Sequence, residues 1–331
     1  MYPFVSDLLP DVFGIPWPFP FNLNSFGLMV ATALLVAAWL TQKELDRKHA
    51  TGRIAPVRAK VKDGKGRVRE KKVSPSFYVW TLMGIAAVAG IVGSKLFNIF
   101  DFWDQFVQDP IGTLFSGAGL TFYGGLILAA LCVAWYARWK KIQIPPLADS
   151  IAPGLMLAYG IGRIGCYLSV DGDWGLCSTL ADKPGWIPGW LWTETFPRAY
   201  VYQAGIQDPV AFNAQVRGIE CAIPGAVGVY PTMIYEVVLA GLLGGLLWAL
   251  RKHPYKAGWL FGLYLVLQGV ERFVIEFLRT NKTWALGLSQ SQWISIGLFA
   301  LGAFLLLRLT RREPAPPASG EPAAEPAPVA A

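Results

Sequence analysis

The sequence is poor in charge, cysteine and histidine, and each shortage excludes a class of protein. Charged residues make up 15% of the 331 residues, well below the roughly 25% of typical soluble domains. Four cysteines are too few for a disulfide scaffold. The two histidines, His49 and His253, fall outside the long apolar runs, which excludes a histidine-rich metal site there. The G-x-S-x-G, H-E-x-x-H and P-loop motifs are also missing, so no serine hydrolase, zinc protease or nucleotide site is indicated.

A charged leader is lacking too. Residues 1–24 contain five prolines and no Lys or Arg, so the basic segment that opens a secretory signal peptide is missing. We therefore expect the first membrane span to act as its own insertion signal.

What the sequence has in abundance is apolar residues, at 54% of the chain. Apolar runs of about 20 residues suit a hydrocarbon core ~30 Å thick, because a helix rises 1.5 Å per residue. The sequence predicts an all-α polytopic membrane protein with about seven transmembrane helices. The expected spans are residues 26–40, 77–100, 121–139, 147–168, 232–250, 258–278 and 293–309.

The connecting segments alternate in charge, which predicts an orientation. Twelve of the 29 basic residues lie between Lys43 and Lys72. Beside a span such a run more often sets orientation than binds nucleic acid, and it touches anionic lipids. The positive-inside rule then puts the N-terminus outside and the C-terminus inside. We expect one membrane domain, residues 1–312, with a basic cytoplasmic loop at 41–76, an outer-face cap at 169–231 and a disordered Pro/Ala-rich tail at 313–331.

Charged residues inside spans are functional candidates, because their burial in lipid is costly. Arg163 follows Tyr159 on one stripe of the fourth span, and Arg272 precedes Glu276 by four residues in the sixth. The Arg272–Glu276 spacing fits a structural salt bridge as well as catalysis. Both arginines lie ~8 to 9 Å inside the outer ends of their spans, counted at 1.5 Å per residue. Guanidiniums at that depth suit a phosphate headgroup, although the sequence fixes depth and not the direction in which each side chain points.

Three further groups belong to the same outer region. Glu236 lies near the start of the fifth span. Tyr123, Gly124 and Gly125 open the third span, where paired glycines permit close approach of a ligand or of a neighbouring helix. By itself Tyr123 is more simply a residue of an interfacial aromatic belt. Cys177 lies in the expected cap and is a candidate for a disulfide with Cys221, whereas Cys132 and Cys166 are expected to be packed thiols.

The order of several motifs resembles that of the phosphatidylglycerol–prolipoprotein diacylglyceryl transferases of bacterial inner membranes. The likeness extends over residues 26–309. The motifs are Ser-Phe-Gly-Leu-Met (25–29), Leu-Thr-Phe-Tyr-Gly-Gly-Leu-Ile (120–127), Gly-Arg-Ile-Gly-Cys-Tyr-Leu-Ser (162–169), Asp-Trp-Gly (173–175), Tyr-Pro-Thr-Met-Ile-Tyr-Glu (230–236), Glu-Arg-Phe-Val-Ile-Glu-Phe-Leu-Arg (271–279) and Leu-Ser-Gln-Ser-Gln (288–292).

The resemblance implies transfer of a diacylglyceryl group from phosphatidylglycerol to the thiol of a lipobox cysteine in a prolipoprotein signal peptide, with release of glycerol 1-phosphate. No metal or soluble cofactor is required, and the enzyme is expected in the inner membrane with its site facing the outer leaflet. It also implies that Arg163 and Arg272 are essential. Together with the residues above, we expect catalytic roles for Arg163, Arg272, Tyr123 and Glu236, and substrate binding by Gly124, Gly125, Tyr159, Cys166, Asp171, Gly175, Tyr235, Glu276 and Arg279.

The sequence departs from the family pattern at several of these positions. The glycine pair follows Tyr123 where the family often has histidine, Cys166 stands where asparagine is common, and Phe26 replaces a tyrosine. The 169–173 stretch is one residue longer than the commoner form. Without a histidine, Tyr123, Asp171 or Glu236 must assist deprotonation of the thiol, or the arginines must help it to ionise. The competing interpretations are a diverged homologue with another acceptor and a lipid-binding or transport protein without chemistry.

Overall fold

The computed structural model describes residues 2, 4–62, 68–115, 122–169, 175–194, 228–279 and 283–311, with only the backbone described at Tyr123 and a few other positions. The chain divides into two compact units, Met1–Ala37 with Ala152–Arg312 and Ala38–Ile151 with Glu313–Ala331. Two long helices, α2 (Ser25–Ala50) and α7 (Ile144–Ser169), each contribute to both units. The expected tail, residues 313–331, lies outside the described residues.

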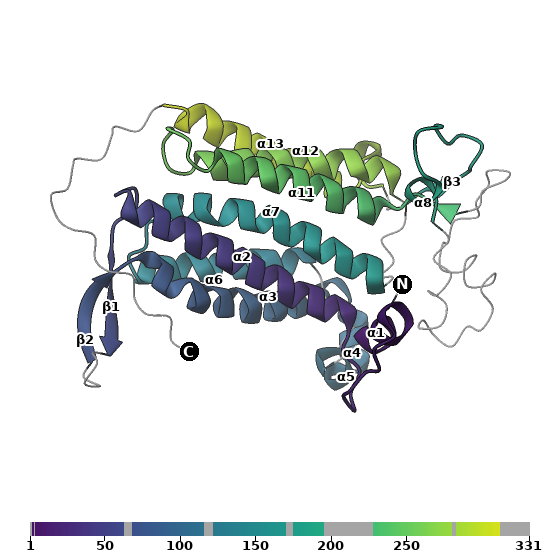
Figure 1. Cartoon of the computed structure of the whole chain (residues 1–331), viewed down its shortest axis with the longest axis horizontal. Coiled ribbons are helices and arrows are strands. Elements are labelled where there is room, and N and C mark those ends of the chain that lie inside the picture. The colour runs from purple at the N-terminus through teal and green to yellow at the C-terminus, as the bar shows by residue number, and fades with distance from the viewer. Residues whose placement is uncertain are drawn as a thin grey trace. The chain divides into compact units, whose positions relative to one another are not determined.

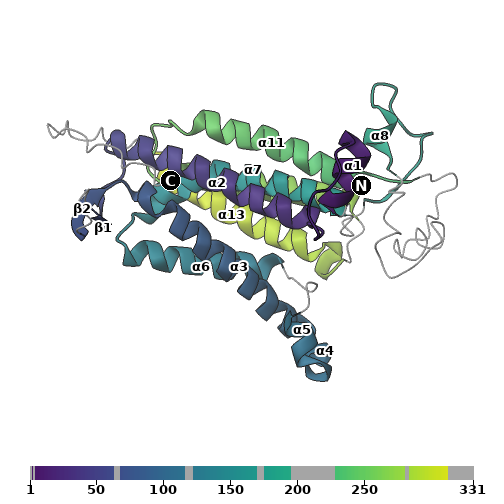
Figure 2. The same cartoon turned by 60° about the horizontal axis from the view of Figure 1, so that its bottom comes forward.

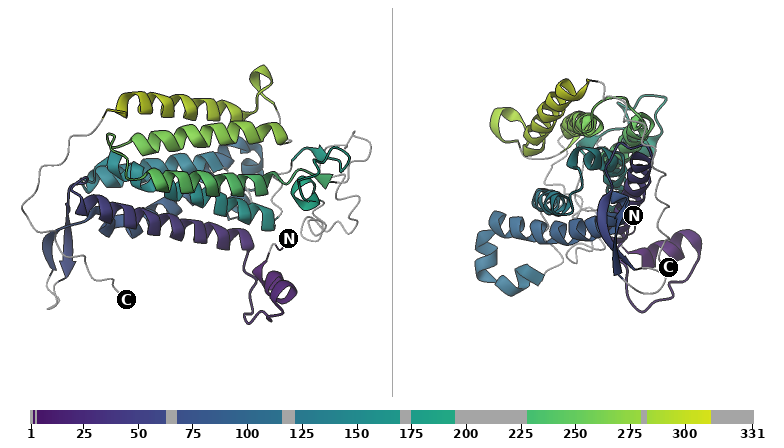
Figure 3. Two further views of the ribbon diagram at one scale, coloured as in Figure 1. Left: turned by 45° about the horizontal axis from the view of Figure 1, so that its top comes forward. Right: turned by 90° about the vertical axis from the view of Figure 1, so that its left-hand side faces the viewer.

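In the first unit, helices α11 (Thr232–Leu250), α12 (Trp259–Ile275) and α13 (Gln290–Leu309) lie side by side (Figures 1 and 3). The later part of α7 packs on them around a small core of Met156, Ala240, Leu247 and Leu260. Short elements complete the unit: α1 (Val5–Phe13), β3 (Cys177–Ser178), α8 (Gly189–Trp192), β4 (Gly228–Val229), η2 (Glu276–Leu278) and η3 (Ala285–Gly287).

The second unit is built on the contact between α3 (Val79–Asp101) and α6 (Phe122–Trp139), which run alongside each other (Figure 2). Glycines permit this close approach: a Cβ at Gly93 would lie 2.4 Å from the carbonyl oxygen of Gly124. The other elements are β1 (Val57–Lys62), β2 (Val68–Val73), η1 (Pro75–Tyr78), α4 (Trp103–Gln108) and α5 (Pro110–Phe115).

The mostly helical fold and its exposed apolar faces confirm a polytopic membrane protein. Among the described helices, five are long and apolar enough to cross a membrane: Ser25–Ala50, Pro75–Phe100, Ile144–Ser169, Thr232–Leu250 and Gln290–Leu309. The two other predicted spans correspond to α6 and α12, which have 18 and 17 residues. Side chains such as Ile91, Leu131 and Leu242 are more than half exposed on these helices, as lipid-facing residues are.

The basic segment at 41–76 is not a simple loop. Helix α2 continues ten residues beyond the predicted end of the first span, to Ala50, and basic side chains in its last turn complement the helix dipole. Strands β1 and β2 then form an antiparallel hairpin. The basic connection predicted between the first two spans is therefore partly ordered, and its cytoplasmic location stays a prediction. Most of the predicted cap lies outside the described residues, but Gly175–Glu194 and the β3–β4 pair belong to it.

Candidate active site

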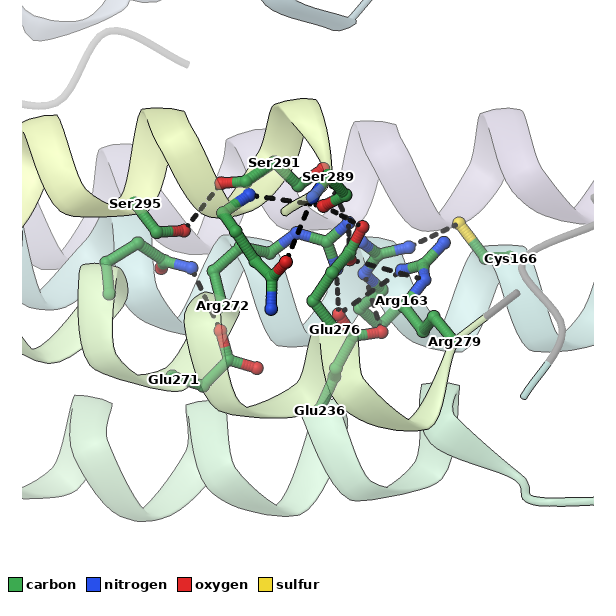
Figure 4. A network of polar contacts seen from close by, with 12 residues as sticks. Arg163, Cys166, Glu236, Glu271, Arg272, Glu276, Arg279, Ser289, Ser291 and Ser295 are labelled. Atoms are coloured by element: carbon green, nitrogen blue, oxygen red, sulfur yellow. Dashed lines mark hydrogen bonds and ion pairs between the residues drawn. The ribbon is translucent and has the colours of Figure 1, made fainter. Parts of the chain in front are cut away.

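The centre of the site is the carboxylate of Glu236, which is fully buried in the second turn of α11. Its Oε1 accepts hydrogen bonds from the Tyr159 hydroxyl at 2.6 Å and from Arg272 Nη1 at 2.8 Å. Arg163 Nε lies 3.1 Å from Oε2, and Arg279 Nη1 lies 3.6 Å from Oε1. One carboxylate thus orients three guanidiniums, as Figure 4 shows.

Close packing of α7 on α11 brings the first two partners to Glu236. Tyr159 and Arg163 are one helical turn apart on α7 and share a face. Next to Tyr159, Gly160 lets the helices approach, because a Cβ there would lie 2.9 Å from the Cβ of Ala240. A small-residue contact therefore sets the distance at which Arg163 meets the carboxylate.

The end of α12 supplies the second part of the network. Arg272 Nη2 lies 3.1 Å from Oε2 of Glu276, the ion pair predicted from their spacing, and Arg279 Nε lies 3.9 Å from the same oxygen. Oε1 of Glu276 accepts a 2.7 Å hydrogen bond from the Ser289 hydroxyl. Ser289 also caps α13 in a capping box with Gln292. The start of α13 is thereby tied to the carboxylate that orients Arg272.

Backbone pairing positions Arg279 just beyond the helix end. Arg279 forms an isolated antiparallel bridge with Gly175, and Leu176 N–H donates to the carbonyl of Leu278 at 2.7 Å. A Cβ at Gly175 would lie 2.3 Å from the carbonyl oxygen of Tyr230. Only glycine fits between these two backbones, which accounts for Gly175 without a direct contact to substrate.

We call Arg163, Glu236, Arg272, Glu276 and Arg279 the arginine–carboxylate cluster. Its ion pairs bring three guanidiniums onto two carboxylates. The side chains of Arg163 and Arg272 are 13% and 15% exposed, whereas that of Arg279 is 3% exposed. Such a cluster favours an anion that approaches Arg163 and Arg272.

Sequence reasoning missed Glu271. This residue is 5% exposed, and its carboxylate accepts a 3.1 Å hydrogen bond from the Gln268 amide. The Tyr159 hydroxyl also lies 3.4 Å from Glu271 Oε1, although its shorter contact is with Glu236. An acidic residue within an apolar run is itself a sign of a functional site. Glu271 was not predicted because it lies outside the series of residues four apart, Gln268, Arg272 and Glu276, that defines the predicted helix face.

Two predicted substrate-binding residues lie at the margin of the cluster. Cys166 Sγ is 4.0 Å from Arg163 Nη1. The Tyr235 hydroxyl instead donates a 2.6 Å hydrogen bond to the carbonyl of Leu191. Tyr235 therefore ties α11 to α8.

The glycine pair of the third span belongs to the second unit. Gly124 and Gly125 face α3 so closely that a Cβ at Gly124 would lie 2.4 Å from Phe97 Cβ. Close approach to a neighbouring helix, one of the two interpretations left open, is thus observed. The Tyr123 side chain and Asp171 lie outside the described part of the chain. Cys177 is disulfide-bonded, Cys221 is not described, and Cys132 and Cys166 are not in a disulfide.

Comparison with known proteins identifies the family of this chain. Residues 14–308 match the family described as prolipoprotein diacylglyceryl transferase. A phosphatidylglycerol–prolipoprotein diacylglyceryl transferase of Leptospira interrogans is 26% identical, and the match covers 92% of this chain and 94% of that protein. Proteins of the same name from Corynebacterium efficiens and Dehalococcoides mccartyi are 29% and 30% identical, over 90% and 71% of this chain and 81% and 78% of theirs. The chain belongs to the prolipoprotein diacylglyceryl transferase family.

Proposed function

We propose that this protein transfers the diacylglyceryl group of phosphatidylglycerol to the thiol of a lipobox cysteine in prolipoproteins. The product is a thioether, and glycerol 1-phosphate is released. Family membership supports the reaction, and the arginine–carboxylate cluster supports its location in this chain.

The observation that carries the proposal is the convergence of Arg163 and Arg272 on Glu236 from two different helices. Each arginine contacts the carboxylate with only part of its guanidinium, Nε for Arg163 and Nη1 for Arg272. The side chains of Arg163 and Arg272 are 13% and 15% exposed, so an incoming phosphate can still reach them. Anchoring also orients the two guanidiniums before substrate arrives, which lowers the cost of binding.

In the proposed reaction the cysteine sulfur, as a thiolate, attacks the glycerol carbon that bears the phosphate ester. A carbon–sulfur bond forms while the carbon–oxygen bond breaks, and its electron pair leaves with the phosphate oxygen. The phosphate group gains one negative charge during this step. Arg163 and Arg272 stabilise that charge more strongly in the transition state than in the ground state, which is the requirement for catalysis.

The proton of the thiol needs an acceptor, and Tyr123, Asp171 and Glu236 are the candidates. Glu236 is already bound by guanidiniums, so we assign it the role of orienting them. The pH dependence of kcat in Tyr123→Phe and Asp171→Asn separates the other two, because loss of the acceptor removes the acidic limb of the profile, where activity rises as the base loses its proton.

We further propose the complete membrane arrangement: seven spans, N-terminus outside and C-terminus inside, with the cluster facing the outer leaflet of the bacterial inner membrane. The charge asymmetry of the connecting segments supports it. Labelling of single cysteines introduced at Gly52 and at Gly185, in a chain without its other cysteines, tests it. Impermeant reagent is expected to reach Gly185→Cys in intact cells and Gly52→Cys only after permeabilisation.

The enzymatic test uses purified protein in detergent with phosphatidylglycerol and a synthetic lipobox peptide. Release of glycerol phosphate and lipidation of the peptide are measured for the wild type, Arg163→Ala, Arg272→Ala and the control Arg308→Ala. Arg308 is an exposed arginine in the last turn of α13. We expect both products from the wild type and the control, and loss of both from the two cluster variants.

Other outcomes distinguish the competing functions. Release of glycerol phosphate without lipidation indicates a different acceptor. Retention of phosphatidylglycerol by a folded wild type with neither product indicates a binding protein. Full activity in Arg163→Ala or Arg272→Ala overturns the assignment of the site.

A further inference from the structure

The hairpin β1–β2 in the second unit carries a concentration of exposed positive charge. Its two six-residue strands have a single exposed carboxylate, Glu70. Against it stand the exposed cationic side chains of Arg58, Lys60, Lys62, Arg69, Lys71 and Lys72. The transfer reaction proposed above uses none of these residues.

The strand register places like charges opposite each other in the hairpin. Lys60 lies opposite Glu70, but Arg58 lies directly opposite Lys72. Like charges in opposite positions of an antiparallel pair destabilise it. The arrangement becomes favourable when an external anion binds across both side chains.

The hairpin is a fixed platform. Val57 and Ala59 are buried in the core of the second unit with Leu45 and Tyr78, and the Tyr78 hydroxyl donates a 3.1 Å hydrogen bond to the carbonyl of Arg58. The backbone that carries the cations is therefore ordered before any ligand binds, which avoids the entropic cost of ordering a loop.

Aromatic residues mark where the neighbouring helices leave the bilayer. Trp80 lies in the first turn of α3 and Trp139 at the end of α6, and both are more than half exposed. Lys140 Nζ lies 4.2 Å from the Trp139 ring centroid, and Lys43 Nζ lies 3.7 Å from that of Trp39. Exposed tryptophans beside lysines are typical of the membrane–water interface. The hairpin packs on these same helix ends.

The orientation of the hairpin strands also fits a position at the membrane–water interface. In Figures 1 and 3 the strands run across the axes of α3 and α6 rather than along them. When these helices cross the bilayer, the strands extend along its surface at the depth of the headgroups. We propose that the hairpin β1–β2 is a docking surface for anionic phospholipid headgroups of the membrane leaflet beside which it lies. This role is independent of the transfer reaction.

Binding of a lipid that is not the proposed substrate tests this. The full-length protein is purified in neutral detergent, and native mass spectrometry measures retention of phosphatidylserine and of phosphatidylcholine. We compare the wild type with the quadruple variant Arg58→Gln, Lys60→Gln, Lys62→Gln, Lys72→Gln. Each basic residue near an anionic surface strengthens binding by about fivefold. We therefore expect the wild type to prefer phosphatidylserine, and the variant to lose that preference by about tenfold or more.

A charge-matched control separates the hairpin from total charge. It carries glutamine at four exposed basic positions elsewhere, Lys252, Lys256, Arg308 and Arg311, and is expected to lose less of the lipid preference than the hairpin variant. Circular dichroism and thermal unfolding without added lipid verify that each variant folds. The hairpin variant is expected to remain active in the transferase assay.

Three results overturn the proposal. They are equal retention of the two lipids by the wild type, an unchanged preference in the hairpin variant, and an equal loss in the control. Binding of a single-stranded RNA oligonucleotide at 150 mM salt, abolished in the hairpin variant and without a lipid preference, assigns the surface to nucleic acid instead.

Discussion

Replacing Glu236 by glutamine tests the role of the arginine–carboxylate cluster most directly. The side chain keeps its shape and one acceptor oxygen but loses the charge that faces three guanidiniums at 2.8, 3.1 and 3.6 Å. Removing one partner from a buried ion pair typically costs about 3 to 5 kcal/mol, because the remaining charge stays buried. Glutamine still accepts a hydrogen bond, so we expect a loss of about 3 kcal/mol in the free energy of unfolding.

Glu236 affects catalysis by positioning the arginines rather than by contacting the substrate. Without the carboxylate the three arginines repel one another, and Arg163 and Arg272 no longer hold the phosphate in a fixed place. A displacement of about 1 Å at a reacting group lowers the rate by about 100-fold. We expect kcat to fall by about that factor. The KM for phosphatidylglycerol is not expected to rise, because loss of the carboxylate makes the cluster more positive and an anionic lipid is still attracted to it.

Two measurements check this prediction. Denaturation by SDS in mixed micelles gives the free energy of unfolding, and glycerol phosphate release gives kcat and KM. Glu70→Gln, on the exposed hairpin, is the matched control and is expected to change neither. Wild-type stability together with wild-type kcat in Glu236→Gln would refute the idea that this carboxylate orients the arginines.

The remaining predictions concern packing and capping. Gly93→Ala is expected to lower the unfolding free energy by about 1 to 3 kcal/mol, because its Cβ meets the backbone of α6 at 2.4 Å; Gly84→Ala has open space and is expected to be neutral. Ser289→Ala removes both the α13 cap and a hydrogen bond to a buried carboxylate, so denaturation is expected to show a loss of about 2 kcal/mol. Gly175→Ala is expected to lower transferase activity as well as stability, because its Cβ would clash with the backbone of Tyr230 and disturb the bridge between Gly175 and Arg279. Gly185→Ala, with no neighbour within 4 Å, is expected to keep both.

Local features of the site were predictable from the sequence, and the direction of its side chains was not. Spacing alone predicted the ion pair between Arg272 and Glu276, because residues four apart on a helix are neighbours. The meeting of Arg163 and Arg272 at Glu236 depends on the rotation of three helices about their axes. That rotation is set by contacts such as the one at Gly160, which sequence periodicity does not specify.

The hairpin shows a signal that was present and overlooked. A search for apolar runs discards residues 57–73 because they are strongly charged. Val57, Ala59 and Val61 nevertheless alternate with basic residues, and an Asp-Gly pair follows at 63–64, a pattern typical of a strand that leads into a tight turn. The extension of α2 to Ala50 was missed for a related reason, because its last two turns are helical in propensity and not apolar.

The position of Glu236 also has a consequence for how this chain changes by mutation. Because a single carboxylate receives arginines from α7 and from the end of α12, the effect of substituting one arginine depends on which others remain. Double substitutions there are expected to be strongly non-additive. Drift at any one of these positions then alters the tolerance of the others, so the cluster is expected to evolve as a unit while the surrounding apolar surface varies freely.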